Sequence, residues 1–172
     1  MTKAIQERVF IQGNLDCPRT RFVAARYGNV LASRGSVIPL FHEQIRRGGP
    51  VTITTDDMTR FLMTLDQAVD TVLAALREGR PGEIYIPRVP SAKVTDLAAV
   101  LIGDRPIETV VTGIRPGEKI HEILVSEEES YRTVGRGAFL AIKPMLPELA
   151  GIDEPLALPE GHAYSSADHL VD

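Results

Sequence analysis

Apolar residues in the first fifty positions repeat at the spacing of two helices with one strand-like run between them. Residues 1–14 carry three apolar side chains at helical spacing, which predicts a short amphipathic helix, and no capping residue precedes them. Residues 20–27 are apolar and partly β-branched, which is typical of a strand, and they end at a Gly-Asn pair. Residues 36–47 combine apolar positions with two final arginines, and a glycine pair follows, which predicts a second helix.

The alternation of strand-like and helix-like segments continues to residue 112. Residues 51–54, 83–87 and 108–112 have the β-branched and aromatic composition of strands. An apolar stripe behind a threonine cap predicts a helix over residues 64–79, and a further helix is predicted over residues 91–101. Strands that alternate with helices of roughly 10 to 15 residues predict an α/β fold with a largely parallel sheet.

The pattern ends near Pro144, where periodicity is lost and prolines interrupt the chain. We therefore expect residues 1–144 to form the folded domain. Residues 145–172 are expected to form an irregular tail that packs over this domain or is partly mobile. No repeat at a fixed period is visible along the sequence.

Composition narrows the class of protein. The chain has 172 residues and a formal net charge of −4, with 44% hydrophobic and 24% charged residues, which is ordinary for a globular domain. The acidic balance argues against nucleic-acid binding. No apolar run approaches the roughly 20 residues that span a bilayer, and the single cysteine, Cys17, excludes an internal disulfide. We expect a soluble, cytoplasmic protein without a membrane span.

Two common kinds of site find no support in the residues. An α/β chain invites a search for a phosphate-binding glycine loop, yet no Gly-x-Gly-x-x-Gly sequence follows a predicted strand. The histidines are scattered without the paired spacing of metal ligands, so we expect no metal site. These histidines are His42, His121, His162 and His169.

Three arginines, Arg34, Arg60 and Arg115, stand in loops or at strand ends, where functional arginines are expected. Loops beyond the carboxyl ends of parallel strands form the ligand crevice of open α/β sheets, and a guanidinium there can hold a phosphate through two hydrogen bonds. Arg115 precedes a Pro-Gly turn that holds Glu118 nearby, so a cation and a carboxylate can face one ligand. Asn29 follows a strand end and suits a sugar or phosphate oxygen. The alternatives are surface arginines paired with acids and a plain turn at Asn29.

Five short blocks in order carry a resemblance to a known family. They are residues 26–30, 33–39, 58–61, 86–91 and 113–122. Together they resemble the C-terminal half of the inverting UDP-N-acetylglucosamine 4,6-dehydratases, which are extended short-chain dehydrogenase/reductases of the CapD-like polysaccharide biosynthesis group. The resemblance runs from Thr2 to about Pro144, and residues 164–166 fit the tail of that group. It implies part of a Rossmann-type fold, with a partial parallel sheet and a substrate-binding region, and with the N-terminal dinucleotide-binding half absent.

The resemblance also implies roles for the matching residues. Lys3 stands at the end of the family's Y-x-x-x-K element, so it would hold the nicotinamide ribose and lower the pKa of a catalytic tyrosine. The nicotinamide end of NADP would be lined by a second group: Val30, Leu31, Ala32, Ser33 and Arg34. The UDP-sugar would be contacted by Asn29, Val37, Thr54 and Arg115, with Arg60 and Glu118 as weaker candidates for its phosphate and ribose.

The resemblance implies chemistry that this chain holds only in part. In the complete enzyme, a lyase and a homo-oligomer, NADP takes hydride from C4 of the sugar, water leaves across C5 and C6, and hydride returns to C6 with inversion at C5. The family's glycine loop, its Asp-Lys pair and its tyrosine would precede Thr2. We therefore expect no turnover by this chain alone.

Several functions stay open from the sequence. The first is a truncated or split dehydratase of capsule, polysaccharide or flagellin-sugar biosynthesis that needs the N-terminal half as a separate chain. The second is a fragment of a UDP-sugar 4-epimerase, because epimerases share the layout. The others are a non-catalytic UDP-sugar-binding module and a purely structural protein, since half a parallel sheet leaves an unpaired strand edge.

Overall fold

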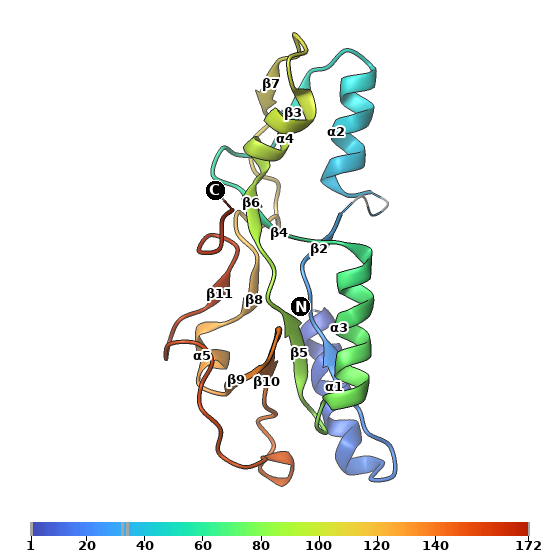
Figure 1. Cartoon of the computed structure of the whole chain (residues 1–172), viewed down its shortest axis with the longest axis vertical. Helices are drawn as coiled ribbons and strands as arrows, with labels where there is room; N and C mark the ends of the chain where they lie inside the picture. The colour runs from blue at the N-terminus through green and yellow to red at the C-terminus, as the bar shows by residue number, and fades with distance from the viewer. Residues whose placement is uncertain (1, 32, 34, 172) are drawn as a thin grey trace. The chain divides into compact units, whose positions relative to one another are not determined.

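Figure 1 shows the computed structural model of the chain, which describes residues 2–31, 33 and 35–171. The chain forms two compact units, and each is considered by itself. Both are built from segments that lie far apart in the sequence. Unit 1 consists of Met1–Tyr27, Asp66–Arg88 and Leu124–Tyr164. Unit 2 consists of Gly28–Leu65, Val89–Ile123 and Ser165–Asp172.

Unit 1 is built on a four-stranded sheet with strand order β1-β5-β10-β9. Its strands are β1 (Ala24–Ala25), β5 (Ile84–Pro87), β9 (Thr133–Arg136) and β10 (Phe139–Ile142). β1 runs parallel to β5, whereas β5, β10 and β9 are antiparallel neighbours. All four residues of β5 are buried, because this strand lies inside the sheet. Gly137, with a φ of 61°, allows the tight turn between β9 and β10.

Two long helices accompany this sheet. They are α1 (Thr2–Asp16) and α3 (Leu65–Glu78), and a short helix α5 (Glu127–Ser130) and a 3₁₀ turn η1 (Pro147–Leu149) follow later in the chain. Asp66 in the first turn of α3 and Arg77 in its last turn suit the helix dipole. α3 buries only its small side chains Ala68, Thr71 and Ala75. Its large apolar side chains, which the sequence predicts to form the buried face, are exposed: Leu65, Val69, Val72, Leu73 and Leu76.

Unit 2 is organised around a hydrophobic cluster between two helices and a short strand. The helices are α2 (Val37–Arg46) and α4 (Val94–Ile102), and the strand β3 (Val51–Ile53) pairs in parallel with β7 (Thr109–Val111). Figure 1 shows α2 and α4 beside this pair of strands. The cluster consists of Phe41, Ile45, Val51, Ile53, Met58, Val94, Ala98 and Ile102.

A second small sheet of unit 2 has strand order β2-β4-β6. Its strands are β2 (Asn29–Val30), β4 (Thr59–Met63) and β6 (Ser91–Lys93). β2 runs parallel to β4, and β6 is antiparallel to β4. Gly28 approaches β4 so closely that a Cβ atom there would lie 2.6 Å from the Cβ of Phe61, so only glycine fits this position. The remaining strands, β8 (Ile123–Val125) and β11 (Tyr164–Ser165), each contain a division between the units.

The α/β class is confirmed, but the strand pattern differs from the expectation in three ways. First, the sheets are mixed: parallel pairs join β1 to β5, β2 to β4 and β3 to β7, and the other described pairs in the two larger sheets are antiparallel. Second, β2, β4, β6, β8, β9, β10 and β11 were not predicted, and Asn29, which was expected to follow a strand end, lies in β2. Third, the strand expected over residues 20–27 is formed only at Ala24–Ala25.

The segment after residue 144 contains little regular structure beyond η1 and β11. It is nevertheless tied to both units by backbone contacts within each. In unit 1, Leu156 forms an isolated antiparallel bridge with Val134, and in unit 2, Leu170 forms a parallel bridge with Ser91. Tyr164 and Ser166 are buried. Among the helices that the structure describes, none has both the length and the apolar content needed to cross a membrane.

Candidate functional site

One pocket of unit 2, with a volume of about 210 Å³, collects polar side chains from four places in the sequence. All six residues that the resemblance relates to the sugar nucleotide line it. They are Asn29, Val37, Thr54, Arg60, Arg115 and Glu118. The sequence did not single out the other residues of its wall, among them Ser36, Leu40, Met58, Val94 and Thr112.

The parallel pair of β3 and β7 brings two sides of this pocket together. The carboxyl ends of parallel strands lie at the same edge, so Thr54 after β3 and Thr112 after β7 become neighbours. The Thr112 N–H donates to the carbonyl of Ile53 at 2.8 Å, and the Gly113 N–H donates to the carbonyl of Thr54 at 3.0 Å. The strand pairing thus continues into the two loops that line the pocket.

The turn after β7 presents Arg115 and Glu118 to the pocket. Gly117, with a φ of 82°, closes the turn, and the Glu118 N–H donates to the Arg115 carbonyl at 3.0 Å. The Glu118 carboxylate accepts from the Thr54 hydroxyl at 3.1 Å and from the Arg115 N–H at 3.3 Å. Arg115 is exposed, and no carboxylate of the described residues forms an ion pair with its guanidinium. Arg115 is therefore the cation of this pocket that is available to an anionic ligand.

Arg60 has a different setting from the one the sequence indicates. It was expected in a loop or at a strand end, and this expectation is wrong, because Arg60 lies inside β4. Its guanidinium donates to the carbonyls of Thr59 at 2.7 Å, Ile120 at 2.9 Å and Lys119 at 2.9 Å. These bonds fasten the loop that follows the Arg115 turn, so Arg60 supports the wall of the pocket.

A buried polar cluster lies behind the pocket, and the sequence did not assign a role to its members. The Thr59 hydroxyl lies 2.8 Å from Nδ1 of His121 and 2.7 Å from the hydroxyl of Ser166. The Ser166 hydroxyl also accepts the N–H of Glu122 at 2.9 Å. A signal existed in the sequence, since Glu122 and His121 belong to the block that carries Arg115, but Ser166, the partner of Glu122, lies more than forty residues away.

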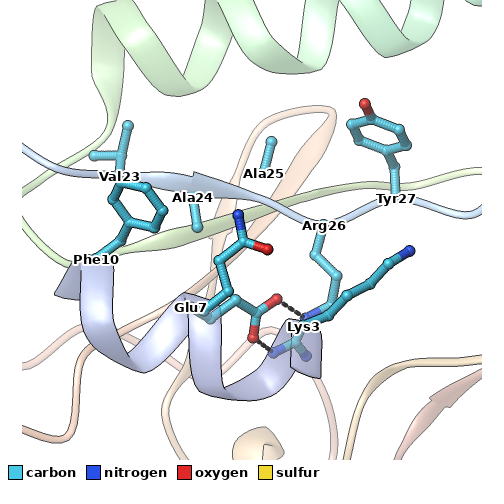
Figure 2. A pocket seen from close by; sticks show the side chains of 9 residues that line it. Lys3, Glu7, Phe10, Val23, Ala24, Ala25, Arg26 and Tyr27 are labelled. Carbon is cyan, nitrogen blue, oxygen red and sulfur yellow. Dashed lines mark hydrogen bonds and ion pairs between the residues drawn. The ribbon is translucent and has the colours of Figure 1, made fainter. Parts of the chain in front are cut away.

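A second pocket, of about 450 Å³, lies in unit 1 between α1 and β1. In Figure 2, Phe10 and Val23 lie toward one end of it, and Lys3 and Tyr27 lie toward the other. Lys3 comes from the first turn of α1 and is exposed.

Arg26 is the centre of one ion-pair network in unit 1. Its guanidinium contacts Glu7 of α1 at 2.6 Å and Glu129 of α5 at 2.8 Å, and it also donates to the carbonyl of Leu124 at 2.8 Å. Burial alone would lower the pKa of Arg26, but the hydrogen bonds and charges of Glu7 and Glu129 outweigh it, so the pKa is raised. Burial likewise opposes ionisation of Glu129, yet the Arg26 hydrogen bond and the Ser126 N–H hold the pKa of Glu129 below its usual value.

The described residues that are expected around NADP come from both units. Lys3 belongs to unit 1, whereas Val30, Leu31 and Ser33 belong to unit 2, where Val30 and Leu31 are half-buried and Ser33 is exposed. Ala32 and Arg34 lie outside the described residues. In the pocket that Lys3 lines, the other charged groups, Glu7 and Arg26, are paired with each other.

Metal binding finds no geometric support in the described part of the chain. Within it, no group of three or more His, Cys, Asp or Glu side chains is arranged to hold an ion.

Comparison with known proteins shows that most of the chain matches one family. Residues 1–144 match the family described as polysaccharide biosynthesis protein. The chain belongs to this family. It is 47% identical over 141 residues to an uncharacterized membrane protein of Methanocaldococcus jannaschii, covering 76% of this chain and 42% of that protein. It is 40% identical over 148 residues to the UDP-N-acetylglucosamine 4,6-dehydratase (inverting) of Campylobacter jejuni, covering 84% and 44%.

Another relative, whose sequence identity lies between those of the first two, is named for a different activity. The chain is 45% identical over 133 residues to the UDP-glucose 4-epimerase of Rickettsia massiliae, which covers 75% of this chain and 39% of that protein. The chain thus spans about two fifths of the length of these curated relatives. The resemblance to the dehydratase group is confirmed, and the matched family includes proteins named for two reactions.

Solved structures support the fold. Pen from Bacillus thuringiensis aligns with a TM-score of 0.81 at 31% identity, over 95% of this chain and 51% of the Pen chain. The UDP-glucuronic acid 4-epimerase from Bacillus cereus, solved with UDP-glucuronic acid and NAD, aligns with a TM-score of 0.54 at 20% identity, over 64% of this chain and 38% of its own. The second likeness concerns the fold alone.

Proposed function

We propose that the chain binds a UDP-sugar in the pocket of unit 2 and forms the sugar-nucleotide side of a nucleotide-sugar dehydratase for polysaccharide biosynthesis. One observation carries the proposal. The six residues that the dehydratase resemblance relates to the substrate come from four places in the sequence, and all six line a single pocket. Independent surface residues would not be expected to converge in this way.

The chemistry of the pocket suits a nucleoside diphosphate sugar. Arg115 is exposed at its wall and can hold a phosphate oxygen pair through two charge-assisted hydrogen bonds. Glu118, fixed by the Thr54 hydroxyl, offers a carboxylate that can accept from ribose hydroxyls. Val37 and Leu40 of α2 add apolar surface for a ring. A cation, a carboxylate and apolar surface around one pocket are the groups that such a ligand requires.

The 172 residues hold only part of a nicotinamide site. A nicotinamide dinucleotide, NADP in our proposal, needs a glycine loop, and no Gly-x-Gly-x-x-Gly sequence occurs in the 172 residues. Lys3 would meet the nicotinamide ribose once a polypeptide with that loop is present. We accordingly propose turnover only together with such a polypeptide, and in an oligomer.

A 4-epimerase is the second candidate, because the epimerase of Rickettsia massiliae is 45% identical to the chain. Product analysis with a chain that supplies the dinucleotide-binding half separates the two reactions. A 4-keto-6-deoxy sugar nucleotide supports the dehydratase, and a C4 epimer supports the alternative. Either product released by this chain alone, with NADP and UDP-N-acetylglucosamine, would contradict the need for a second polypeptide.

Calorimetry with UDP tests the binding proposal directly. Replacing Arg115 with alanine removes a charge-assisted contact to phosphate, which is worth roughly 1.5 to 3 kcal/mol, and we therefore expect UDP affinity to fall at least about tenfold. The matched control is Arg88→Ala, because Arg88 is an equally exposed arginine that lies in unit 1 and outside the pocket. Equal affinities for the wild type and Arg115→Ala would argue against the site, as would absence of UDP binding by the wild type.

A further inference from the structure

Glu122 lies next to two residues that line the pocket of unit 2. Its carboxylate faces the side-chain amide of Asn29 on β2, and the backbone N–H of Phe61 on β4 donates to it at 3.3 Å. The same carboxylate lies 4.0 Å from Nε of Arg60. Asn29 and Arg60 line the pocket, whereas Glu122 stands behind them. Glu122 therefore contacts residues that meet a ligand without lining the pocket itself.

The contact between Glu122 and Asn29 determines which way the Asn29 amide faces. An ionised carboxylate only accepts hydrogen bonds, and an amide has a donor end and an acceptor end. Two acceptor oxygens do not face each other, so the Asn29 nitrogen is the end toward Glu122, 3.0 Å from Oε2. Oε1 is also within reach of the same nitrogen. The amide oxygen of Asn29 is thus the end that lies away from Glu122.

The tail of the chain keeps Glu122 in place. The Ser166 hydroxyl accepts the Glu122 N–H at 2.9 Å, and the Ser166 N–H donates to the Glu122 carbonyl at 2.8 Å. Ser166 is fully buried, and its own carbonyl accepts the hydroxyl of Ser91 at 2.6 Å. Both backbone groups of Glu122 are thus fixed, and the Phe61 N–H gives its carboxylate a contact that does not depend on Asn29.

The backbone before Asn29 adds a second constraint. At Gly28 an added Cβ would lie 2.6 Å from Phe61, and this close approach brings β2 against β4 near the Glu122 carboxylate. Asn29 is therefore held at a short distance from Glu122 by strand pairing as well as by its own hydrogen bond.

From these contacts we propose that Glu122 is a positioning residue that turns the Asn29 amide oxygen toward the ligand. The pocket then requires a hydrogen-bond donor at Asn29, such as a hydroxyl or an amide N–H of the sugar nucleotide. Phosphate oxygens only accept hydrogen bonds, so they would not bind to the Asn29 amide oxygen and would bind to Arg115 instead. This inference rests on the proposed function for its ligand, but the orientation of the amide can be measured without one.

The first experiment follows the Asn29 side-chain NH₂ group by NMR in the full chain. Glu122→Gln replaces an acceptor with a group that both donates and accepts, so the amide loses its fixed direction. We expect the Asn29 NH₂ resonances to shift and their hydrogen exchange to accelerate about tenfold or more, since a charged acceptor roughly doubles the strength of such a bond. Glu127→Gln, at an exposed glutamate of α5, is the matched control and should leave these resonances unchanged. Unchanged Asn29 resonances in Glu122→Gln would overturn the proposal.

The second experiment is a double-mutant cycle with UDP-N-acetylglucosamine as the ligand. Glu122→Gln is expected to weaken binding about fivefold to tenfold, and Asn29→Ala by a similar factor, which is the size of one hydrogen bond. If Glu122 acts through Asn29, the double variant binds no more weakly than Asn29→Ala alone, whereas a purely structural role gives multiplied losses. Multiplied losses would overturn the proposal. A wild type that does not bind the ligand would refute the proposed function, and the NMR result would still decide the orientation.

Discussion

Replacing Arg26 with methionine is expected to lower the free energy of unfolding by about 2 to 3 kcal/mol, although the new side chain fills similar space. The five N–H donors of Arg26 are all used, on Glu7, on Glu129 and on the carbonyl of Leu124. Its removal leaves Glu7 without this cation and leaves Glu129 with only the more distant Arg132, at 3.8 Å. The side chains of Arg26 and Glu129 are 23% and 17% exposed, so solvent reduces the effect below that of a fully buried pair.

Urea unfolding is the appropriate measurement, because an uncharged denaturant does not screen the ion pair. Arg19→Met, at an exposed arginine of the same unit, is the control, for which we expect a change within about 0.5 kcal/mol. Equal losses of stability in both variants would show that the effect comes from removing one positive charge, and not from losing the bonds of Arg26 to Glu7 and Glu129.

The pH dependence of this effect has a definite sign. The pKa of Glu129 in the folded chain is lowered from its ordinary value of 4.5, so its contribution is fully present above pH 4.5 and is lost as the pH falls through the lowered value. The variant lacks the part of this contribution that Arg26 supplies, whereas the Ser126 N–H and Arg132 remain. The difference in stability between wild type and Arg26→Met should therefore be largest near pH 7 and shrink below pH 4.5. A difference that stays constant over this range would contradict the assignment.

Replacing Phe41 with alanine is expected to cost about 3 to 5 kcal/mol, the usual range for a buried phenylalanine. Phe41 is 0% exposed and lies in the cluster that α2 forms with β3 and α4. Alanine would leave a cavity at the point where α2 rests on β3. Because both elements carry walls of the pocket in unit 2, we expect UDP binding to weaken together with stability.

The neighbouring residue supplies the control for this substitution. Leu40 lies on the same helix but is 49% exposed, so Leu40→Ala changes helix propensity by the same kind of replacement without a core cavity. Its stability loss should stay below about 1 kcal/mol. Denaturant unfolding of both variants checks the pair, and comparable losses would mean that α2 does not hold unit 2 together through Phe41.

The sequence predicted those elements whose pattern is long or sharply bounded. The helix behind Thr64 and the helix that ends at Gly48 were predicted closely, because apolar spacing and terminal residues agreed. β4 was missed although it alternates buried and half-buried residues, since Arg60 and Leu62 occupy its outer positions and hide the change of face. β9 and β10 form a hairpin through local pairing, but β10 joins the sheet by pairing with β5, which is distant in the sequence and which no local pattern reports.

The sequence predicted which residues line the candidate site, but not which residues hold them in place. Arg115 and Glu118 stand out in a short motif, and parallel strands place such loops at one edge. The groups that hold the acidic residues in place could not be predicted from the sequence. They are the Thr54 hydroxyl, which bonds to Glu118, and the buried Ser166, which bonds to the backbone of Glu122. These partners lie at least forty residues away along the chain, so only folding reveals them.

Strand β1 has one further consequence, for the behaviour of the protein in concentrated solution. Its two flanking N–H groups, on Ala24 and Arg26, donate to β5, whereas the N–H of Ala25 points away from β5, toward the side where the four-stranded sheet ends. Exposed Ile5, Val9 and Phe10 of α1 lie in the same unit. An open backbone edge in a unit with uncovered apolar side chains recruits further strands, so self-association of purified chains would compete with folding as concentration rises.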